Sequence, residues 1–231
     1  MRVHESQCFR RRMGTSAPKW LIASIFDPEF GPDLLDDCDA VIFGGTGEVK
    51  IHHPRLQHVL PCARALVRAA AENGVPFLGV SFGHQIVANA FGAPVVEDPK
   101  HSELGLARIS LTDAGKADPL FAGFPEAFDA IAGHNDSVET VPSELELLAI
   151  GDRCRNQVFR LPGSVFYTTQ FHPELDEEDL RVRVKHYRAQ YPQPGAEPIE
   201  RDVAKLGPTP DANRLVARFI ELATGRVSPT A

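Results

Sequence analysis

Strand-like and helix-like segments alternate through the first half of the chain, and this alternation restricts the fold more than any other feature. Short apolar runs at residues 20–26, 40–43 and 77–80 predict strands. Apolar residues between positions 59 and 70 recur with a 3.6-residue period, which predicts a helix that ends at Asn73 and Gly74. A second helix is predicted from Ile86 to Gly92. Such alternation is typical of an α/β fold whose parallel strands are covered by helices.

The second half of the sequence is richer in strands. Apolar runs predict strands at residues 106–111, 128–132 and 145–150, and residues 157–161 and 164–171 predict a hairpin around Pro162 and Gly163. Antiparallel strands are common additions to a mainly parallel sheet. Four acidic residues from position 176 favour the start of a helix, and Thr209 followed by Pro210 predicts the N-cap and first residue of a last one.

Composition predicts one globular domain spanning residues 1–231. Hydrophobic residues make up 43% of the chain and charged residues 24%, which are ordinary values for a protein with a real core. A net charge of -7 opposes non-specific binding to nucleic acid or to anionic lipid. No apolar run approaches the ~20 residues that span a bilayer, and none follows the basic N-terminus as a signal peptide requires. We therefore expect a cytoplasmic protein without nucleic-acid or membrane partners.

The cysteines and histidines do not form a metal-binding or redox motif. Four cysteines are spread along the chain with no C-x-x-C pair, so neither a zinc site nor a redox pair is predicted. Three histidines lie close together at positions 52, 53 and 58, but they lack the carboxylate or thiolate partner that usually completes a metal site. We expect no metal and no cofactor.

The run G-V-S-F-G at residues 79–83 fits the G-x-S-x-G pattern of a nucleophile elbow. In this arrangement a strand turns sharply into a helix and presents the central side chain, here Ser81. Glycines are needed on either side because side chains there would collide as the backbone reverses. A serine between two glycines is often only a turn. Its position between a buried strand and a helix favours a nucleophile.

A serine nucleophile needs a base and a group that orients the base. His172 and Glu174 offer both at the end of the predicted strand 164–171. In an extended chain, residues two apart point to the same side, so the Glu174 carboxylate can steady the His172 ring. The alternative is a strand end that carries a surface histidine and glutamate.

Four motifs, taken together, resemble those of the class I glutamine amidotransferases. The run G-V-S-F-G-H-Q at 79–85 is similar to the family's G-[IV]-C-x-G-H-Q, and Q-F-H-P-E at 170–174 matches its Q-F-H-P-E. The run F-G-G-T-G at 43–47 resembles its S-G-G-P-G loop. The run G-H-N-D-S-V at 133–138 resembles the S-H-G-D-x-V segment of the GMP-synthetase-like branch. The motifs occur in family order between residues 40 and 174.

The resemblance implies a flavodoxin-like fold, an open and mostly parallel sheet with helices on both faces and added antiparallel strands. It also implies hydrolysis of a glutamine or γ-glutamyl amide through a γ-glutamyl enzyme, with the ammonia passed to a synthetase or acceptor on a separate protein. Position 81 would be the nucleophile, His172 the base and Glu174 its orienter. The remaining implied roles are the oxyanion hole at the backbone N–H groups of Gly45 and Phe82, and substrate binding by Gly47, Gln85, Asn135 and Asp136.

Two features depart from the family pattern. Ser81 stands where the family has cysteine, and a hydroxyl must lose its proton during attack, whereas a thiol is partly ionised near neutral pH. In addition, the family begins with a central strand, yet residues 1–8 read as a polar helix start. We expect the reading frame to continue upstream with an apolar run, which would pair with the strands predicted at 20–26 and 40–43.

Two other functions remain compatible with these residues. A serine hydrolase or peptidase on the same fold explains a triad without cysteine but not the presence of Gln85 or the segment around Asp136. A non-catalytic protein of the amidotransferase type explains the loss of cysteine but not the retained His172 and Glu174. Nucleotide binding by residues 44–47 is weaker, because the loop lacks the rest of the G-x-G-x-x-G or P-loop pattern.

Overall fold

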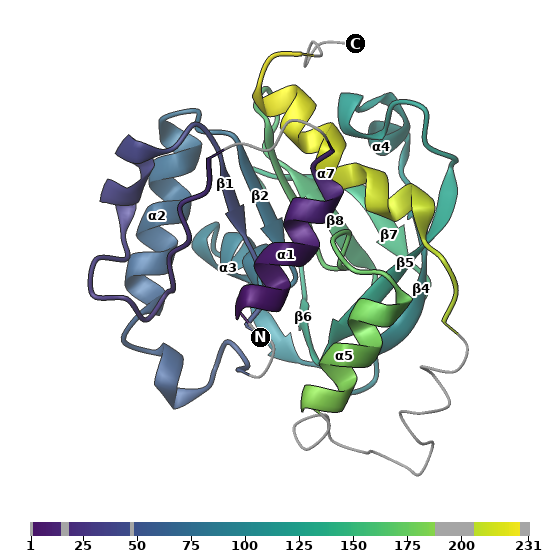
Figure 1. Cartoon of the computed structure of the whole chain (residues 1–231), viewed down its shortest axis with the longest axis horizontal. Coiled ribbons are helices and arrows are strands. Elements are labelled where there is room, and N and C mark those ends of the chain that lie inside the picture. Colours follow the sequence, from purple (N-terminus) through teal and green to yellow (C-terminus); the bar gives the residue numbers. More distant parts are fainter. Residues whose placement is uncertain (1, 15–18, 47–48, 188–205, 227–231) are drawn as a thin grey trace.

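A computed structural model describes residues 2–14, 19–46, 49–187 and 206–226, and its centre is a seven-stranded mixed sheet (Figure 1). The strands follow the order β1-β2-β9-β8-β7-β4-β5, and β3 pairs separately with β6. Their bounds are β1 Val41–Phe43, β2 Phe77–Val80, β3 Val95–Glu97, β4 Glu103–Leu111, β5 Ala127–His134, β6 Asp136–Val138, β7 Glu146–Gly151, β8 Asn156–Arg160 and β9 Phe166–Thr169.

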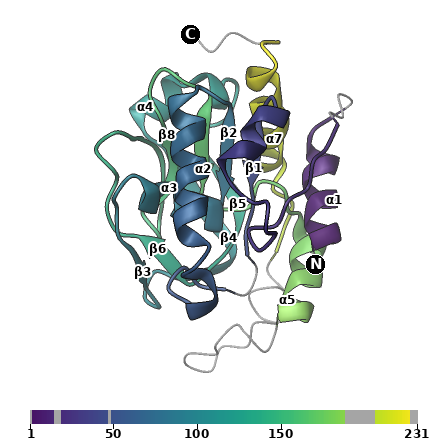
Figure 2. The same cartoon turned by 90° about the vertical axis from the view of Figure 1, so that its left-hand side faces the viewer.

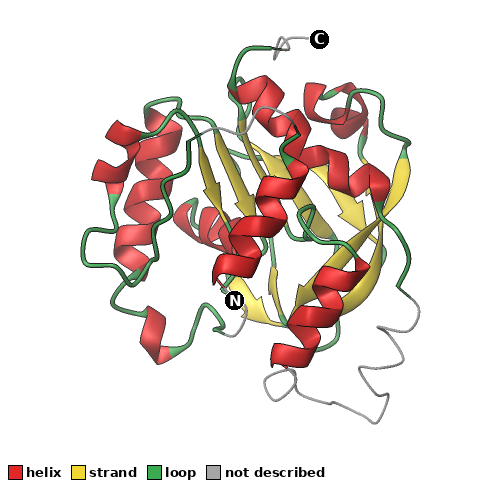
Figure 3. Ribbon diagram, viewed as in Figure 1, coloured by secondary structure: helices red, strands yellow, loops and turns green. Residues whose placement is uncertain are grey.

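Helices cover both faces of the sheet, as Figure 3 shows by colour. In the two orthogonal views, α2 and α3 lie on one face, and α1, α5 and α7 lie on the other (Figures 1 and 2). The α-helices are α1 Arg2–Arg12, α2 Leu60–Glu72, α3 Phe82–Ala90, α4 Asp113–Ala117, α5 Glu177–Tyr187 and α7 Pro210–Ala223. Short 3-10 helices are η1 Pro32–Asp37, η2 Pro54–Leu56 and η3 Pro119–Phe121.

The sheet combines a parallel part with an antiparallel part. Strands β1, β2 and β9 run parallel to one another, whereas β8, β7, β4 and β5 are joined by antiparallel pairings. The hairpin predicted around Pro162 and Gly163 is the β8–β9 pair. The sheet curls into a half-barrel with helices around it. The predicted α/β fold with added antiparallel strands is therefore confirmed.

Strand β2 is apolar throughout because both of its faces are buried. Leu78 and Val80 pack into one core cluster with Phe9 of α1 and Leu215 of α7. Phe77 packs into a second cluster with α2 and α3. Neighbouring residues of a strand point to opposite faces, and a central parallel strand with helices on both sides therefore reads as a continuous apolar run. This packing fixes the end of β2, where Ser81 follows.

The strand predicted at residues 20–26 is wrong. The segment has no strand partner and leads into a turn in which the Ser24 N–H donates to the Asp27 carboxylate at 2.6 Å. Leu21, Ile22 and Phe26 are 59%, 46% and 45% exposed, so this apolar run is not covered on two faces as a central strand would be. Hydrophobicity alone does not say whether a sheet edge is available for pairing.

The helix starts predicted in the second half are confirmed. Helix α5 begins with Glu177, Glu178 and Asp179 in its first turn, and α7 begins at Pro210 after Thr209. The Thr209 hydroxyl, however, makes no capping hydrogen bond. None of the described helices has the length and hydrophobicity of a transmembrane segment.

Candidate active site

Ser81 has a backbone conformation that side chains rarely adopt. It lies between β2 and α3 with φ 56° and ψ −102°, and it is the sole non-glycine residue with positive φ in the described ranges. Such strain persists only where the surrounding structure holds it, and it is concentrated at functional sites. The sharp turn from strand to helix predicted for residues 77–92 is therefore present, with Ser81 at its apex.

The two glycines that flank Ser81 are required by close backbone contacts. A β-carbon on Gly79 would lie 2.8 Å from the Gly83 carbonyl oxygen, and one on Gly83 would lie 2.0 Å from the Phe43 carbonyl oxygen. Neither contact is possible for a real β-carbon. The pattern G-x-S-x-G thus lets the start of α3 press against the end of β1, which holds the turn in place.

His172 and Glu174 form a buried pair at the end of β9. The His172 N–H donates to the Ile131 carbonyl of β5 at 2.7 Å, and its Nδ1 lies 2.8 Å from Glu174 Oε1. Burial opposes ionisation of Glu174, but the electrostatic interaction and hydrogen bond with His172, together with the charge of Arg183, outweigh it and lower the pKa of the carboxyl. The expected contact between these two side chains is present.

Ser81 and His172 face the same small space beside Gly45. A β-carbon placed on Gly45 would lie 3.6 Å from His172 Cε1 and 3.9 Å from Ser81 Cβ. The structure therefore brings the predicted nucleophile, base and orienter together. In the described part of the chain, no hydrogen bond joins the Ser81 hydroxyl to the His172 ring. Catalytic hydrogen bonds are often long without substrate, so this geometry is compatible with the predicted triad.

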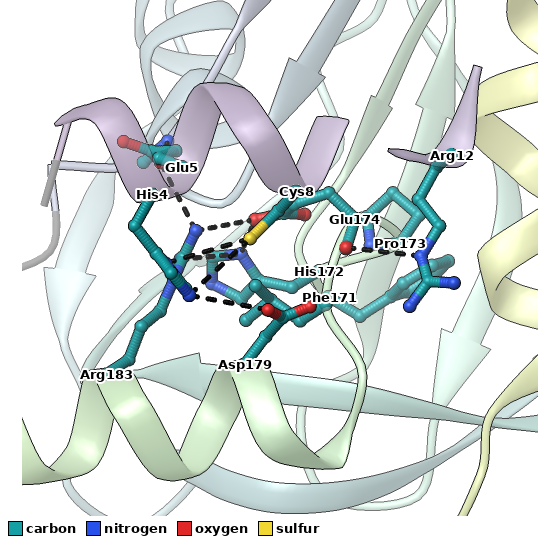
Figure 4. A network of polar contacts seen from close by, with 12 residues as sticks. His4, Glu5, Cys8, Arg12, Phe171, His172, Pro173, Glu174, Asp179 and Arg183 are labelled. Carbon is teal, nitrogen blue, oxygen red and sulfur yellow. Dashed lines mark hydrogen bonds and ion pairs between the residues drawn. The ribbon is translucent and has the colours of Figure 1, made fainter. Parts of the chain in front are cut away.

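A buried arginine supports the pair from α5. Arg183 Nη2 lies 3.1 Å from Glu174 Oε1, and its Nη1 lies 3.5 Å from His172 Nδ1 (Figure 4). The cation helps to lower the pKa of Glu174. No sequence pattern indicated this role, because an arginine among other charged residues on a helix is usually solvated.

The predicted oxyanion hole is partly occupied by an acidic side chain. Phe82 is the first residue of α3, where backbone N–H groups have no acceptor within the helix. The Gly45 N–H, in contrast, donates to Glu5 Oε1 of α1 at 3.2 Å. No sequence motif indicated that Glu5 belongs to the site.

Three of the four predicted substrate-binding residues are described. Gln85 is buried on α3, and its Nε2 donates to the Asp136 carbonyl at 3.1 Å and to Gln170 Oε1 at 3.3 Å. Asp136 Oδ2 accepts from the Ile51 N–H at 3.2 Å, and burial raises the pKa of its carboxyl. Asn135 is half-buried next to it. Gly47 lies outside the described residues.

Two groups of three side chains in the described ranges have the spacing of metal ligands. One group includes Cys8 and Asp179. Arg11 Nη2 lies 3.4 Å from Cys8 Sγ and also forms an ion pair with Asp179, so a guanidinium already contacts these ligand atoms. The other consists of Glu103, His134 and Cys154. There the His134 Nε2 lies 3.0 Å from Glu103 Oε2, which fits a buried hydrogen-bonded network. The sequence-based expectation of no metal stays a prediction.

Comparison with known proteins places these features in a family. The family model described as "Glutamine amidotransferase class-I" matches residues 27–184. A glutamine-hydrolysing GMP synthase component from Thermoplasma acidophilum is 29% identical over 142 residues, which are 62% of this chain and 66% of that protein. The corresponding protein from Methanopyrus kandleri is 36% identical over 101 residues, 44% of this chain and 52% of that protein. The chain thus spans between about half and two thirds of the length of these relatives.

A solved structure agrees with the fold. A glutamine amidotransferase from Thermotoga maritima superposes with a TM-score of 0.66 at 19% identity, over 82% of this chain and 79% of that chain. The resemblance drawn from the four sequence motifs is confirmed by the family model, which covers most of the chain. The chain belongs to the class-I glutamine amidotransferase family.

Proposed function

We propose that this chain hydrolyses the side-chain amide of glutamine, or of a related γ-glutamyl amide, at a site built on position 81. The observation that carries the proposal is the strained backbone of Ser81, whose side chain shares one small space with the His172–Glu174 pair. A nucleophile, a base and an orienting carboxylate in this arrangement suit acyl transfer. Family membership and the similarity to glutamine-hydrolysing relatives support the choice of substrate.

The proposed reaction has two steps. The side-chain oxygen or sulfur at position 81 attacks the amide carbon while its proton moves to His172. Negative charge then develops on the carbonyl oxygen, which the N–H groups of Gly45 and Phe82 stabilise. His172 returns the proton to the departing nitrogen, the carbon–nitrogen bond breaks, and ammonia leaves a γ-glutamyl enzyme. Water, deprotonated by His172, then attacks the ester or thioester carbon. His172 returns this proton to the oxygen or sulfur of position 81 as the acyl bond breaks and glutamate is released.

The substrate needs a binding site, and the ammonia product needs an acceptor. Gln85, Asn135 and Asp136 lie together and are proposed to hold the amino-acid end of the substrate, as is Gly47. Asp136 Oδ1 is buried without a hydrogen-bond partner among the described residues, so it can accept one from a ligand. The ammonia is proposed to pass to a separate synthetase, and the compartment is proposed to be the cytoplasm.

A serine at position 81 is expected to be a weak nucleophile in these surroundings. The test measures ammonia released from L-glutamine by the chain, by Ser81→Cys and by Ser81→Ala as the inactive control. We expect Ser81→Cys to be at least about tenfold faster than the chain, because a thiol is more readily ionised and more nucleophilic than a hydroxyl.

The other outcomes separate the alternatives. Equal and negligible rates for the chain and Ser81→Cys would contradict the proposal and favour a non-catalytic role. A serine form faster than the cysteine form would instead favour a dedicated serine hydrolase.

A further inference from the structure

Helix α1 carries a carboxylate into the centre of the candidate site. Glu5 Oε1 accepts the hydrogen bond of the Gly45 N–H at 3.2 Å. A β-carbon on Gly45 would lie 3.6 Å from this oxygen, 3.6 Å from His172 Cε1 and 3.9 Å from Ser81 Cβ. Figure 4 shows Glu5 reaching from α1 toward Arg183, next to His172 and Glu174. One small space is therefore shared by the Glu5 carboxylate, the imidazole and the Ser81 side chain.

The Glu5 carboxylate is held there although the site is unfavourable for it. Burial raises the pKa of Glu5, and the nearby Glu174 charge acts in the same direction. Arg183 opposes both effects, because its Nη2 lies 3.6 Å from Glu5 Oε1 while it also pairs with Glu174. A half-buried carboxylate is stabilised by such partners. The proposed hydrolysis gives Glu5 no part in bond making or breaking.

The chemistry of Glu5 matches that of the reaction product. Hydrolysis of a glutamine side-chain amide leaves the side-chain carboxylate of glutamate, and Glu5 presents the same group on the same length of side chain. Its oxygen accepts the hydrogen bond of the Gly45 N–H, which is a predicted donor of the oxyanion hole. An incoming substrate carbonyl would need the same N–H group, so the two cannot bind there together.

We infer that Glu5 is an internal product mimic, which occupies the acyl-binding position at Gly45, is held there by Arg183, and keeps L-glutamine and L-glutamate out until it withdraws. This inference rests on the proposed function, since it takes the ligand to be a γ-glutamyl compound. The side chain of Glu5 is 27% exposed and borders solvent. It can therefore rotate outward while Phe9 of α1 and Met13, which follows the helix, stay packed in the core.

The test compares binding of L-glutamate and L-glutamine, measured by isothermal titration calorimetry, to the chain with Ser81 unchanged. The variants are Glu5→Ala, which empties the position, and Glu5→Gln, which keeps the shape but removes the negative charge that Arg183 attracts. Gln7→Ala is the matched control, because Gln7 is exposed on the same helix. Melting temperatures show whether each variant is folded.

We expect Glu5→Ala to bind L-glutamate at least about tenfold more tightly than the chain, since the binding-competent state is no longer a minor one. Glu5→Gln should fall between the two, and Gln7→Ala should match the chain. Equal affinities in the chain and both Glu5 variants would overturn the inference, as would the absence of binding by any of them.

Turnover in a Ser81→Cys background separates this inference from the proposed function. Adding Glu5→Ala there should lower the KM for L-glutamine with little change in kcat. If Glu5→Ala tightens glutamate binding but the Ser81→Cys proteins release no ammonia, the inference stands and the hydrolysis proposal fails. If Ser81→Cys is active and Glu5→Ala changes neither binding nor KM, the hydrolysis proposal stands and the inference fails.

Discussion

Replacing Arg183 with methionine tests how the buried Glu174 carboxylate is kept ionised. The guanidinium lies 3.1 Å from Glu174 Oε1 and 3.6 Å from Glu5 Oε1, while Glu174 is fully buried. Methionine keeps most of the apolar volume and removes the charge. At an effective dielectric constant of about 20, two unit charges at this separation attract by about 5 kcal/mol.

The expected loss of stability is smaller than that attraction. Methionine avoids the several kcal/mol needed to desolvate a guanidinium, and His172 remains as a partner for Glu174. We therefore expect Arg183→Met to lower the free energy of unfolding by about 2–4 kcal/mol at pH 7. Arg181→Met is the matched control, because Arg181 is exposed on the same helix. Its effect should stay within about 0.5 kcal/mol.

The loss of stability caused by Arg183→Met should depend on pH in a defined direction. The pKa of Glu174 lies below its ordinary value of 4.5 in the folded chain, so its contribution is complete above that value and is lost as the pH falls through the folded pKa. The difference between the chain and Arg183→Met should then narrow below about pH 4.5. Urea unfolding between pH 7 and pH 3 measures it. Equal stability of the two arginine variants at pH 7, or a difference that does not change with pH, would refute this account of Arg183.

Two further predictions concern packing and thiols. Gly83→Ala should destabilise the chain by more than about 2 kcal/mol or prevent folding, because its β-carbon would lie 2.0 Å from the Phe43 carbonyl oxygen. The control is Gly207→Ala, whose β-carbon would have nothing within 4 Å. It should change the free energy of unfolding by less than about 0.5 kcal/mol in the same urea assay. A thiol reagent should modify the half-buried Cys38 and Cys62 before unfolding, and Cys8 and Cys154 only after it, since burial raises the pKa of these two thiols to about 12 and about 11. Rapid modification of all four thiols in the native chain would contradict the buried positions.

The local geometry of the candidate site could be predicted because short-range rules determine it. A sharp turn after a buried strand requires glycine on both sides of Ser81, and residues two apart in an extended chain bring Glu174 to His172. The same rules could not identify Glu5 or Arg183. The contact between Glu5 and Gly45 joins residues 40 positions apart, and it depends on how α1 is placed over the sheet.

The fold shows the same division between local and long-range information. The segments around β2, α3, β8 and β9 were predicted correctly, because the period of the apolar residues and the positions of the turn residues indicate the same elements there. Residues 20–26 were predicted as a strand on apolar character alone. Whether such a run pairs depends on a free sheet edge elsewhere in the chain, which composition and periodicity do not reveal.

Covalent labelling of the Ser81→Cys variant tests most directly whether position 81 is the nucleophile. An analogue of glutamine whose amide is replaced by a chloroketone loses chloride to a thiolate and leaves a stable thioether, which peptide mass spectrometry locates. We expect modification at position 81, suppression of this modification by excess L-glutamine, and a much lower rate of modification in the His172→Ala variant. The other four cysteines are internal controls. Modification at those cysteines instead, or at position 81 without protection by glutamine, would contradict the proposed role of position 81 as the nucleophile of a glutamine site.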